Sequence, residues 1–436
     1  MTNEGEQTMI DSKKTTQLKK GFSKEEKSWV KYDIGNSAYS IIISTAVFPL
    51  FYKASANEAG VSAANSTAYL GYTFAIATFI LAMIGPILGT IADYQGNKKR
   101  FFRFFVGLGV SSTVLLAFIP SDQWLLLLIC YIFIVLGSAG SNVFYDAFLV
   151  DVSTDDRMDR VSARGYSLGY IGSTIPFIIS IAIIVLAQNE IIPISVTLAS
   201  KIAFLITAIW WGLFSIPMLK NVHQKYYIER EPNPIANSFK RLGKTFKEIQ
   251  KYRGLFLFLI AYFFYIDGVG TIITMSTAYG SDLGITSTNL LIILFATQVV
   301  AAPFAILYGR LAEKFTGKKM LYVGIFIYTI VCIYAYFMET TFDFWILAML
   351  VATSQGGIQA LSRSYFSKLV PKKHSNEFFG FYNIFGKFAS IMGPLLVAFT
   401  AQVTGDSSKG VFSLIILFII GIIFLWRVPE PKTAEV

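Results

Sequence analysis

A series of long apolar runs constrains this sequence more than any other feature. Each run holds about 20 mostly apolar residues, the length that an α-helix needs to cross about 30 Å of hydrocarbon. Hydrophobic residues make up 54% of the 436 residues and charged residues only 15%, whereas soluble domains carry about 25% charged residues. The composition therefore excludes a disordered chain, a disulfide-stapled module and an ordinary soluble enzyme, and it predicts an integral membrane protein.

The predicted spans fall into two sets of six. They cover residues 29–53, 66–92, 101–120, 124–150, 165–188 and 199–219, and then 254–279, 288–312, 319–338, 342–368, 377–401 and 410–427. We therefore expect an all-α integral membrane protein with twelve transmembrane helices. Its predicted order is a disordered tail 1–28, a six-helix bundle 29–219, a linker 220–253, a second six-helix bundle 254–427 and a short tail 428–436.

Lysine and arginine set the orientation of these spans, because cytoplasmic loops are enriched in both residues. They gather in the first tail, the even-numbered loops and the linker, while the odd-numbered loops hold only Lys53, Lys201 and Lys409. Both tails and the linker are therefore predicted to be cytoplasmic. The same bias explains the net charge of +10 without a nucleic-acid partner, and the basic face is expected to attract anionic lipid headgroups.

A short pattern recurs at the ends of the second and eighth spans. The first copy contains Gly89, Asp93, Gly96, Lys98 and Arg100, and the second contains Gly309, Glu313 and Gly317. In each copy the acidic side chain is expected to accept hydrogen bonds from basic side chains or from a helix N-terminus. Two copies in equivalent loops predict a duplicated transporter. The pattern resembles the loop signature of the major facilitator superfamily, in which two six-helix halves rock about a central site.

Five ionisable side chains lie more than two residues from either end of a predicted span, where each charge is costly unless it has a partner or faces water. They are Asp33, Asp146, Asp267, Arg363 and Lys387. Counting three acids against two bases predicts one unpaired carboxylate. Asp267 is nearest the predicted membrane centre and is our proton-coupling candidate, with structural pairing as the alternative. Arg363 is expected either to bind a substrate carboxylate or to form a gate pair with Asp33 or Asp146.

Polar and aromatic residues at helical spacing around these charges complete the predicted substrate cavity. They are Asn36, Tyr39, Asn142, Tyr145, Tyr265, Gln355, Gln359, Tyr382 and Asn383. The cysteines Cys130 and Cys332 lie in apolar runs, and the histidines His223 and His374 lie in polar connections without recognised metal-ligand neighbours. We therefore expect no cofactor, no metal and no catalytic residue.

Several motifs resemble the UMF1, or Atg22-like, family within that superfamily. They are Trp29-Val-Lys-Tyr32-Asp33, Phe144-Tyr145-Asp146, Ser162-Ala-Arg164-Gly165-Tyr166, Tyr265-Ile-Asp267-Gly268 and Gly356-Gly357-Ile-Gln359-Ala-Leu-Ser362-Arg363-Ser364-Tyr365. The family includes vacuolar amino-acid effluxers of fungi. The resemblance therefore implies a secondary transporter that works by alternating access and exports amino acids or similar small polar solutes, with proton coupling as an option.

The residues leave other substrates open: a sugar, an amphipathic drug, or a glycolipid or other lipid flipped between leaflets. A membrane sensor that does not transport is the alternative from a different class. An enzyme is not expected, because no predicted span contains a histidine and a nucleophile–base or metal constellation is missing. The short loops and the modest length favour a bacterial plasma membrane over a vacuole. We expect a monomer, with a small-molecule substrate and membrane lipids as partners.

Overall fold

The structure is a computed structural model that describes residues 21–229, 231–247, 249–282, 285, 287–405 and 407–430. Apart from an isolated bridge between Tyr94 and Ile228, these residues form helices and their connections. Twelve of the helices are long and apolar enough to span a membrane, which confirms the predicted fold class. Residues 1–20 of the predicted first tail and residues 431–436 of the last tail lie outside the description.

The first half of the chain contributes six spans, of which the first is interrupted by a π-helical segment. Its elements are α2 (Lys24–Ala38), η1 (Tyr39–Ala46), α3 (Val47–Glu58), α4 (Ala63–Ala92), α5 (Asn97–Phe118), α6 (Trp124–Ala147), α7 (Leu149–Val152), α8 (Met158–Gln188) and α9 (Val196–Asn221). The π-helix η1 lies within the first span, between α2 and α3. Such segments inside α-helices are frequent at functional sites.

The second half repeats this arrangement after a connecting segment. The connection contains α10 (Pro234–Lys247) and η2 (Ile249–Tyr252), and the second half contains α11 (Arg253–Asp282), α12 (Ser287–Phe315), α13 (Gly317–Tyr336), α14 (Thr341–Leu369), η3 (Lys372–His374), α15 (Ser375–Thr404), α16 (Ser407–Ser413) and α17 (Ile415–Trp426). The helix α10 lies in the predicted linker 220–253 and carries several of its lysine and arginine residues.

The first span begins earlier than the apolar run alone indicates. The Ser23 side chain accepts a hydrogen bond from the Glu26 N–H, and the Glu26 side chain accepts one from the Ser23 N–H. This capping box starts α2 at Lys24 rather than at Trp29, because it satisfies amide groups that the first helical turn leaves free. Residues 24–28, which the sequence analysis placed in the tail, therefore belong to the first span.

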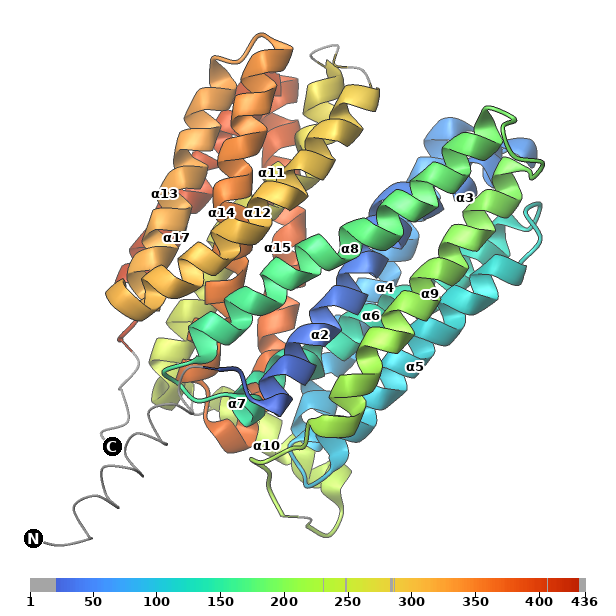
Figure 1. Cartoon of the computed structure of the whole chain (residues 1–436). Helices are drawn as coiled ribbons and strands as arrows, with labels where there is room; N and C mark the ends of the chain where they lie inside the picture. The colour runs from blue at the N-terminus through green and yellow to red at the C-terminus, as the bar shows by residue number, and fades with distance from the viewer. Residues whose placement is uncertain are drawn as a thin grey trace, which may run out of the picture.

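Figure 1 shows two helix bundles that lie close together at one end of the molecule and farther apart toward the other. The close end holds both ends of the described chain and α10. We call it the basic end, because it contains the lysine- and arginine-rich residues 93–100, 153–164, 220–229, 231–247, 249–253 and 370–374. Here Gly89 of α4 packs on the backbone of Asn376 of α15, where an added Cβ would clash with the Asn376 carbonyl.

Candidate functional site

Arg363 on α14 joins the two halves through a buried ion-pair cluster. Its guanidinium lies 3.3 Å from Asp33 Oδ2 on α2 and 3.3 Å from Asp146 Oδ1 on α6. The Arg363 Nε also donates to Ser162 Oγ on α8 at 2.9 Å. Only 3% of the Arg363 side chain is exposed. Because α2, α6 and α8 belong to the first half and α14 to the second, the cluster ties the halves together.

Three aromatic rings surround the same guanidinium. Its carbon lies 4.5 Å from the centroid of Trp29, 4.6 Å from that of Tyr166 and 5.3 Å from that of Tyr145. Trp29 stacks on Tyr145 at 4.4 Å and donates its Nε1–H to the Tyr145 carbonyl at 2.8 Å. Cation–π contacts of this kind are strongest where water is excluded. The enclosure therefore stabilises the charge of Arg363 away from bulk water.

Tyr145 was predicted for this site, whereas Trp29, Ser162 and Tyr166 were not. All three stand in motifs that carry the family resemblance. Their spacing along the chain carries no sign that they meet, because α2 and α8 bring them together only after the helices pack. A tryptophan and a tyrosine beside in-span charges are nevertheless a signal for cation–π partners that could have been used.

Asp267 on α11 is a buried carboxyl with no charged partner. The residue is 0% exposed, and neither of its carboxylate oxygens makes a hydrogen bond or ion pair with the described residues. It lies against α15, where a Cβ added at Gly393 would come 2.8 Å from Asp267 Oδ1. An ionised carboxylate without a partner is costly in such surroundings.

Lys387 on α15 has no carboxylate partner either. Its ammonium lies 6.0 Å from the ring centroid of Phe74 on α4, in the first half of the chain. Of the three in-span carboxylates, Asp267 is the one without a partner in the described chain, in line with the predicted single unpaired carboxylate. Arg363 binds two acids, whereas Asp267 and Lys387 each lack a partner of opposite charge in the described chain.

Most of the other predicted cavity residues make their contacts within one half. Tyr265 shares a 2.7 Å hydrogen bond with Ser362 Oγ, and Tyr382 stacks on Tyr262 with ring centroids 4.3 Å apart. The side-chain amides of Gln359 and Asn383 donate to the backbone carbonyls of Gln355 and Phe379, one helical turn earlier.

The predicted cavity residues of the first half behave in the same way. The Asn36 side chain accepts a hydrogen bond from Ser138 at 3.4 Å, and the Tyr39 ring lies 5.5 Å from the Trp211 ring. Asn142 Oδ1 has no hydrogen-bond partner among the described residues.

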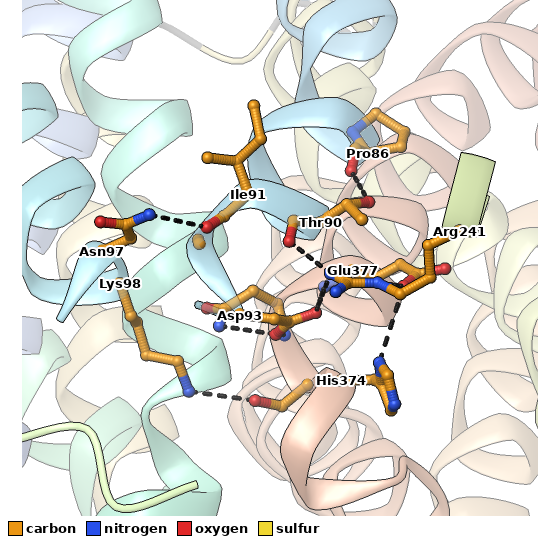
Figure 2. A network of polar contacts seen from close by, with 12 residues as sticks. Pro86, Thr90, Ile91, Asp93, Asn97, Lys98, Arg241, His374 and Glu377 are labelled. Carbon is orange, nitrogen blue, oxygen red and sulfur yellow. Dashed lines mark hydrogen bonds and ion pairs between the residues drawn. The ribbon is translucent and has the colours of Figure 1, made fainter. Parts of the chain in front are cut away.

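A second polar network crosses the basic end around Asp93, the acidic residue of the first loop motif (Figure 2). Asp93 Oδ1 accepts from the backbone and side-chain nitrogens of Asn376 at 3.0 and 2.9 Å, and Oδ2 accepts from the Glu377 N–H at 3.4 Å. Arg241 of α10 lies 3.4 Å from Asp93 and 3.2 Å from Glu377. Asp93 therefore faces both the N-terminus of α15 and a basic side chain, where a negative charge is favourable.

Burial nevertheless raises the pKa of Asp93 from 3.8 to about 7, although Arg241 and Asn376 act in the opposite direction. The residue is 0% exposed, and removal from water disfavours the ionised form of a carboxyl group. The carboxyl that holds the N-terminus of α15 thus titrates near neutral pH.

The remaining motif residues divide into buried contacts and exposed positions. Lys98 is fully buried and donates to Asp151 and Ser375, whereas Arg100 is exposed. Gly96 adopts a φ of 77°, which glycine accommodates without strain. Asp151 was not predicted, because it lies one residue beyond the predicted span 124–150, although the structure includes it in the span Trp124–Val152.

The second copy of the motif does not behave like the first. Gly309 and Gly317 both approach Asp159 at the start of α8. Glu313, however, is exposed and makes no hydrogen bond or ion pair within the described chain. Asp159 instead accepts from Ser364 and Lys368 of α14, both at 2.6 Å. The expected acceptor role of Glu313 is therefore corrected.

The expectation that His374 lacks metal-ligand neighbours also needs correction. His374, Asp93 and Glu377 offer three ligand atoms within 4.8 Å of one another. His374 and Glu377 are three residues apart in the chain, a spacing that can place two ligands on one face of a helix and that was not considered in the prediction. Arg241 already lies between the two carboxylates and compensates one of their two negative charges.

Comparisons with known proteins agree on one family. Residues 23–435 match the family model described as "Vacuole effluxer Atg22 like". The chain is 74% identical over 419 residues to "Uncharacterized MFS-type transporter YxiO" of Bacillus subtilis (strain 168), covering 96% of this chain and 98% of the relative. It is 24% identical over 392 residues to autophagy-related protein 22 of Kluyveromyces lactis, covering 82% and 78% of the two chains.

Solved transporter structures share the architecture. FucP in the outward conformation superposes with a TM-score of 0.67 at 13% identity, over 92% of this chain and 98% of that one. The proton:xylose symporter XylE superposes with a TM-score of 0.67 at 14% identity, over 94% and 96%. At these identities the likeness concerns the fold alone.

Proposed function

This chain belongs to the Atg22-like family of transporters in the major facilitator superfamily, and from this premise we propose that it exports amino acids or similar small polar solutes by alternating access. It is a multi-pass membrane transporter rather than an enzyme. The family description, which names a vacuole effluxer, supports the direction of transport. The similarity to a Bacillus protein supports a place in a bacterial plasma membrane.

The Arg363 cluster carries this proposal, because it has the properties of a gate. Its donors are used by Asp33, Asp146 and Ser162, and rings enclose the side chain, so little of it is left for a substrate. The cluster lies between the halves, and rocking one half against the other must break it. Of the two roles expected for Arg363, the geometry therefore favours the gate pair.

The basic end is proposed to face the cytoplasm, because lysine and arginine are enriched in cytoplasmic loops. The Arg363 cluster and the Asp93 network then close the cytoplasmic side. The bundles lie farther apart at the opposite end (Figure 1). An outward-facing conformation accounts for both features, and it agrees with the likeness to FucP in its outward conformation.

The two unpartnered charges are proposed to handle the substrate and the coupling ion. Lys387 can receive a substrate carboxylate, because its ammonium has no acidic partner in the described chain. Asp267 can carry a proton, because an unpaired charge at a fully buried position is unfavourable. A zwitterionic solute such as an amino acid supplies the carboxylate that Lys387 would receive. The alternative substrates are a sugar, a drug or a lipid, and exchange in proteoliposomes can distinguish a sugar or a lipid from an amino acid.

The test is counterflow exchange in proteoliposomes that contain the purified protein. Vesicles loaded with a mixture of amino acids should accumulate labelled amino acids from outside, while labelled sugars and fluorescent lipids stay unexchanged. Exchange of a sugar or a lipid without exchange of amino acids would replace the proposed substrate.

The gate is tested by reversing its charges. Arg363→Asp should abolish exchange, and Arg363→Asp combined with Asp146→Arg should restore part of it, because an ion pair between the halves is rebuilt. Arg103→Asp, at an exposed position of α5, is the matched control and should leave exchange unchanged. If Arg363 instead bound the substrate, the double variant would stay inactive.

A further inference from the structure

A large cavity lies at the basic end, away from the Arg363 cluster. Its volume is about 800 Å³, and its walls come from α10, from residues 225–229 and Glu231, from Tyr94 after α4 and from the residues before α15. Cavities of 300–1,000 Å³ are the usual size of small-molecule sites. We propose that this cavity binds a phosphate-bearing ligand that keeps the basic end closed.

The charge of the walls favours an anion. Five basic residues line the cavity, namely Lys225, Lys240, Arg241, Lys244 and Lys373, against two acidic ones, Glu229 and Glu231. Glu231 already accepts a hydrogen bond from Asn237 at 2.9 Å. In the described chain the ammonium groups of Lys240, Lys244 and Lys373 make no hydrogen bond or ion pair. Like charges held together in this way are stabilised by a multiply charged anion such as a phosphate.

Aromatic rings give the cavity flat apolar walls. Tyr94, Tyr226 and Tyr227 line it together with the basic residues. The Arg241 guanidinium carbon lies 5.3 Å from the Tyr94 ring centroid, and the Lys372 ammonium lies 5.5 Å from that of Tyr226. Rings beside phosphate-binding cations can stack on a nucleobase. A nucleoside phosphate matches the cavity in volume, charge and surface.

The position of the cavity connects binding to the conformation of the transporter. Tyr94 belongs to the first half, whereas Lys373 and His374 lead into α15 of the second half, and α10 lies between them. Arg241 of α10 is already bonded to Asp93 and Glu377. A phosphate that pairs with Lys240 and Lys373 would therefore hold α10 against the second half, while Arg241 holds α10 against Asp93 of the first half. Together these contacts would stabilise the closed basic end.

Direct binding tests the proposal on the full-length protein in detergent, without reference to transport. ATP and inorganic pyrophosphate are titrated by calorimetry, with adenosine as the uncharged probe. Lys240→Gln/Lys244→Gln should weaken phosphate binding by about tenfold or more, because each lost cation removes charge-assisted bonds. The matched control is Lys220→Gln/Lys247→Gln, which removes the same charge from positions that do not line the cavity. It should change affinity by less than about twofold.

A phosphate can also come from a lipid headgroup, and a second arm separates that source. In nanodiscs, hydrogen exchange of α10 should then be slower with phosphatidylglycerol than with phosphatidylcholine, and Lys240→Gln/Lys244→Gln should remove the difference. Binding in either arm that depends on Lys240 and Lys244 supports the site and identifies the phosphate source. The absence of an effect in both arms overturns the proposal, as does an equal loss in the two double variants. Because neither arm measures transport, failure here leaves the proposed export function standing.

Discussion

The Lys98 ammonium lies 2.6 Å from the Asp151 carboxylate, and both side chains are 0% exposed. The same ammonium donates to Ser375 Oγ of the second half at 3.0 Å, and Asp151 also accepts from the backbone N–H groups of Lys225 and Tyr226. One buried pair thus connects α5, the segment after α9 and the start of α15.

Lys98→Met should destabilise the protein by about 3–5 kcal/mol, because it leaves a buried carboxylate without its cation. Unfolding of the detergent-purified variant, followed by tryptophan fluorescence, measures this loss. Lys98→Met/Asp151→Leu should recover part of it, since both charges are removed together. Arg100→Met, at an exposed position in the same loop motif, is the control. Equal stability of the Lys98 and Arg100 variants would contradict the prediction.

Stability should depend on pH through Asp93. Its pKa is raised from 3.8 to about 7 by burial, so the native state binds this proton more tightly than the unfolded chain does. The contribution of Asp93 to stability therefore falls as the pH rises from about 4 to about 7, and the loss is complete above 7. The difference in unfolding free energy between the wild type and Asp93→Asn should decrease from pH 5 to pH 8.

The matched control for this pH series is Asp122→Asn, because Asp122 is exposed in a loop. Arg241→Gln provides a further check, since removing the cation beside Asp93 should move the pH transition to higher values. A wild-type advantage that grows with pH would show that Asp93 acts as an ordinary ionised partner.

Gly89→Ala should impair the closed state of the basic end. Glycine inside a helix normally lowers stability by about 0.5–1 kcal/mol relative to alanine, so alanine alone would be favourable. At Gly89 the new Cβ meets the Asn376 carbonyl of the other half. Gly107→Ala of α5, where nothing lies within 4 Å of the added carbon, is the control. Thermal unfolding should place the Gly89 variant below the wild type and the Gly107 variant at or above it.

Asp267→Asn should separate exchange from proton-driven transport. The substitution keeps the shape of the side chain but removes its titration, so counterflow exchange should persist while accumulation driven by a pH gradient is lost. Asp122→Asn should retain both activities. Gradient-driven accumulation at the wild-type level in the Asp267 variant would exclude this residue as the proton carrier.

Some features of the site could be predicted in advance because they are local. Asp33, Asp146 and Arg363 could be identified because a charged residue inside an apolar run can be recognised from the sequence alone. The early start of α2 was also readable, since Ser23 and Glu26 have the spacing of a capping box. The apolar run drew attention to Trp29 instead.

Which of these charged side chains form ion pairs could not be predicted from the sequence. Asp33 and Arg363 are 330 residues apart, and their contact exists only because α2, α6, α8 and α14 pack at one point. Counting charges predicts one unpaired carboxylate, but it does not predict that Lys387 also lacks an acidic partner in the described chain. Glu313 and Asp93 share a motif, yet one is exposed and the other buried, because only Asp93 meets α10 and the start of α15.

The sequence by itself determined that the chain spans a membrane twelve times in two related halves. Bilayer thickness and the cost of charge in hydrocarbon constrain each segment separately. Each span can therefore be recognised from its own hydropathy and from the lysine and arginine residues beside it. Only the tertiary structure decided which charges meet, that α10 docks on Asp93 and Glu377, and that a basic cavity forms beside them. Those contacts depend on the distance between helices from different halves, and no segment encodes that distance alone.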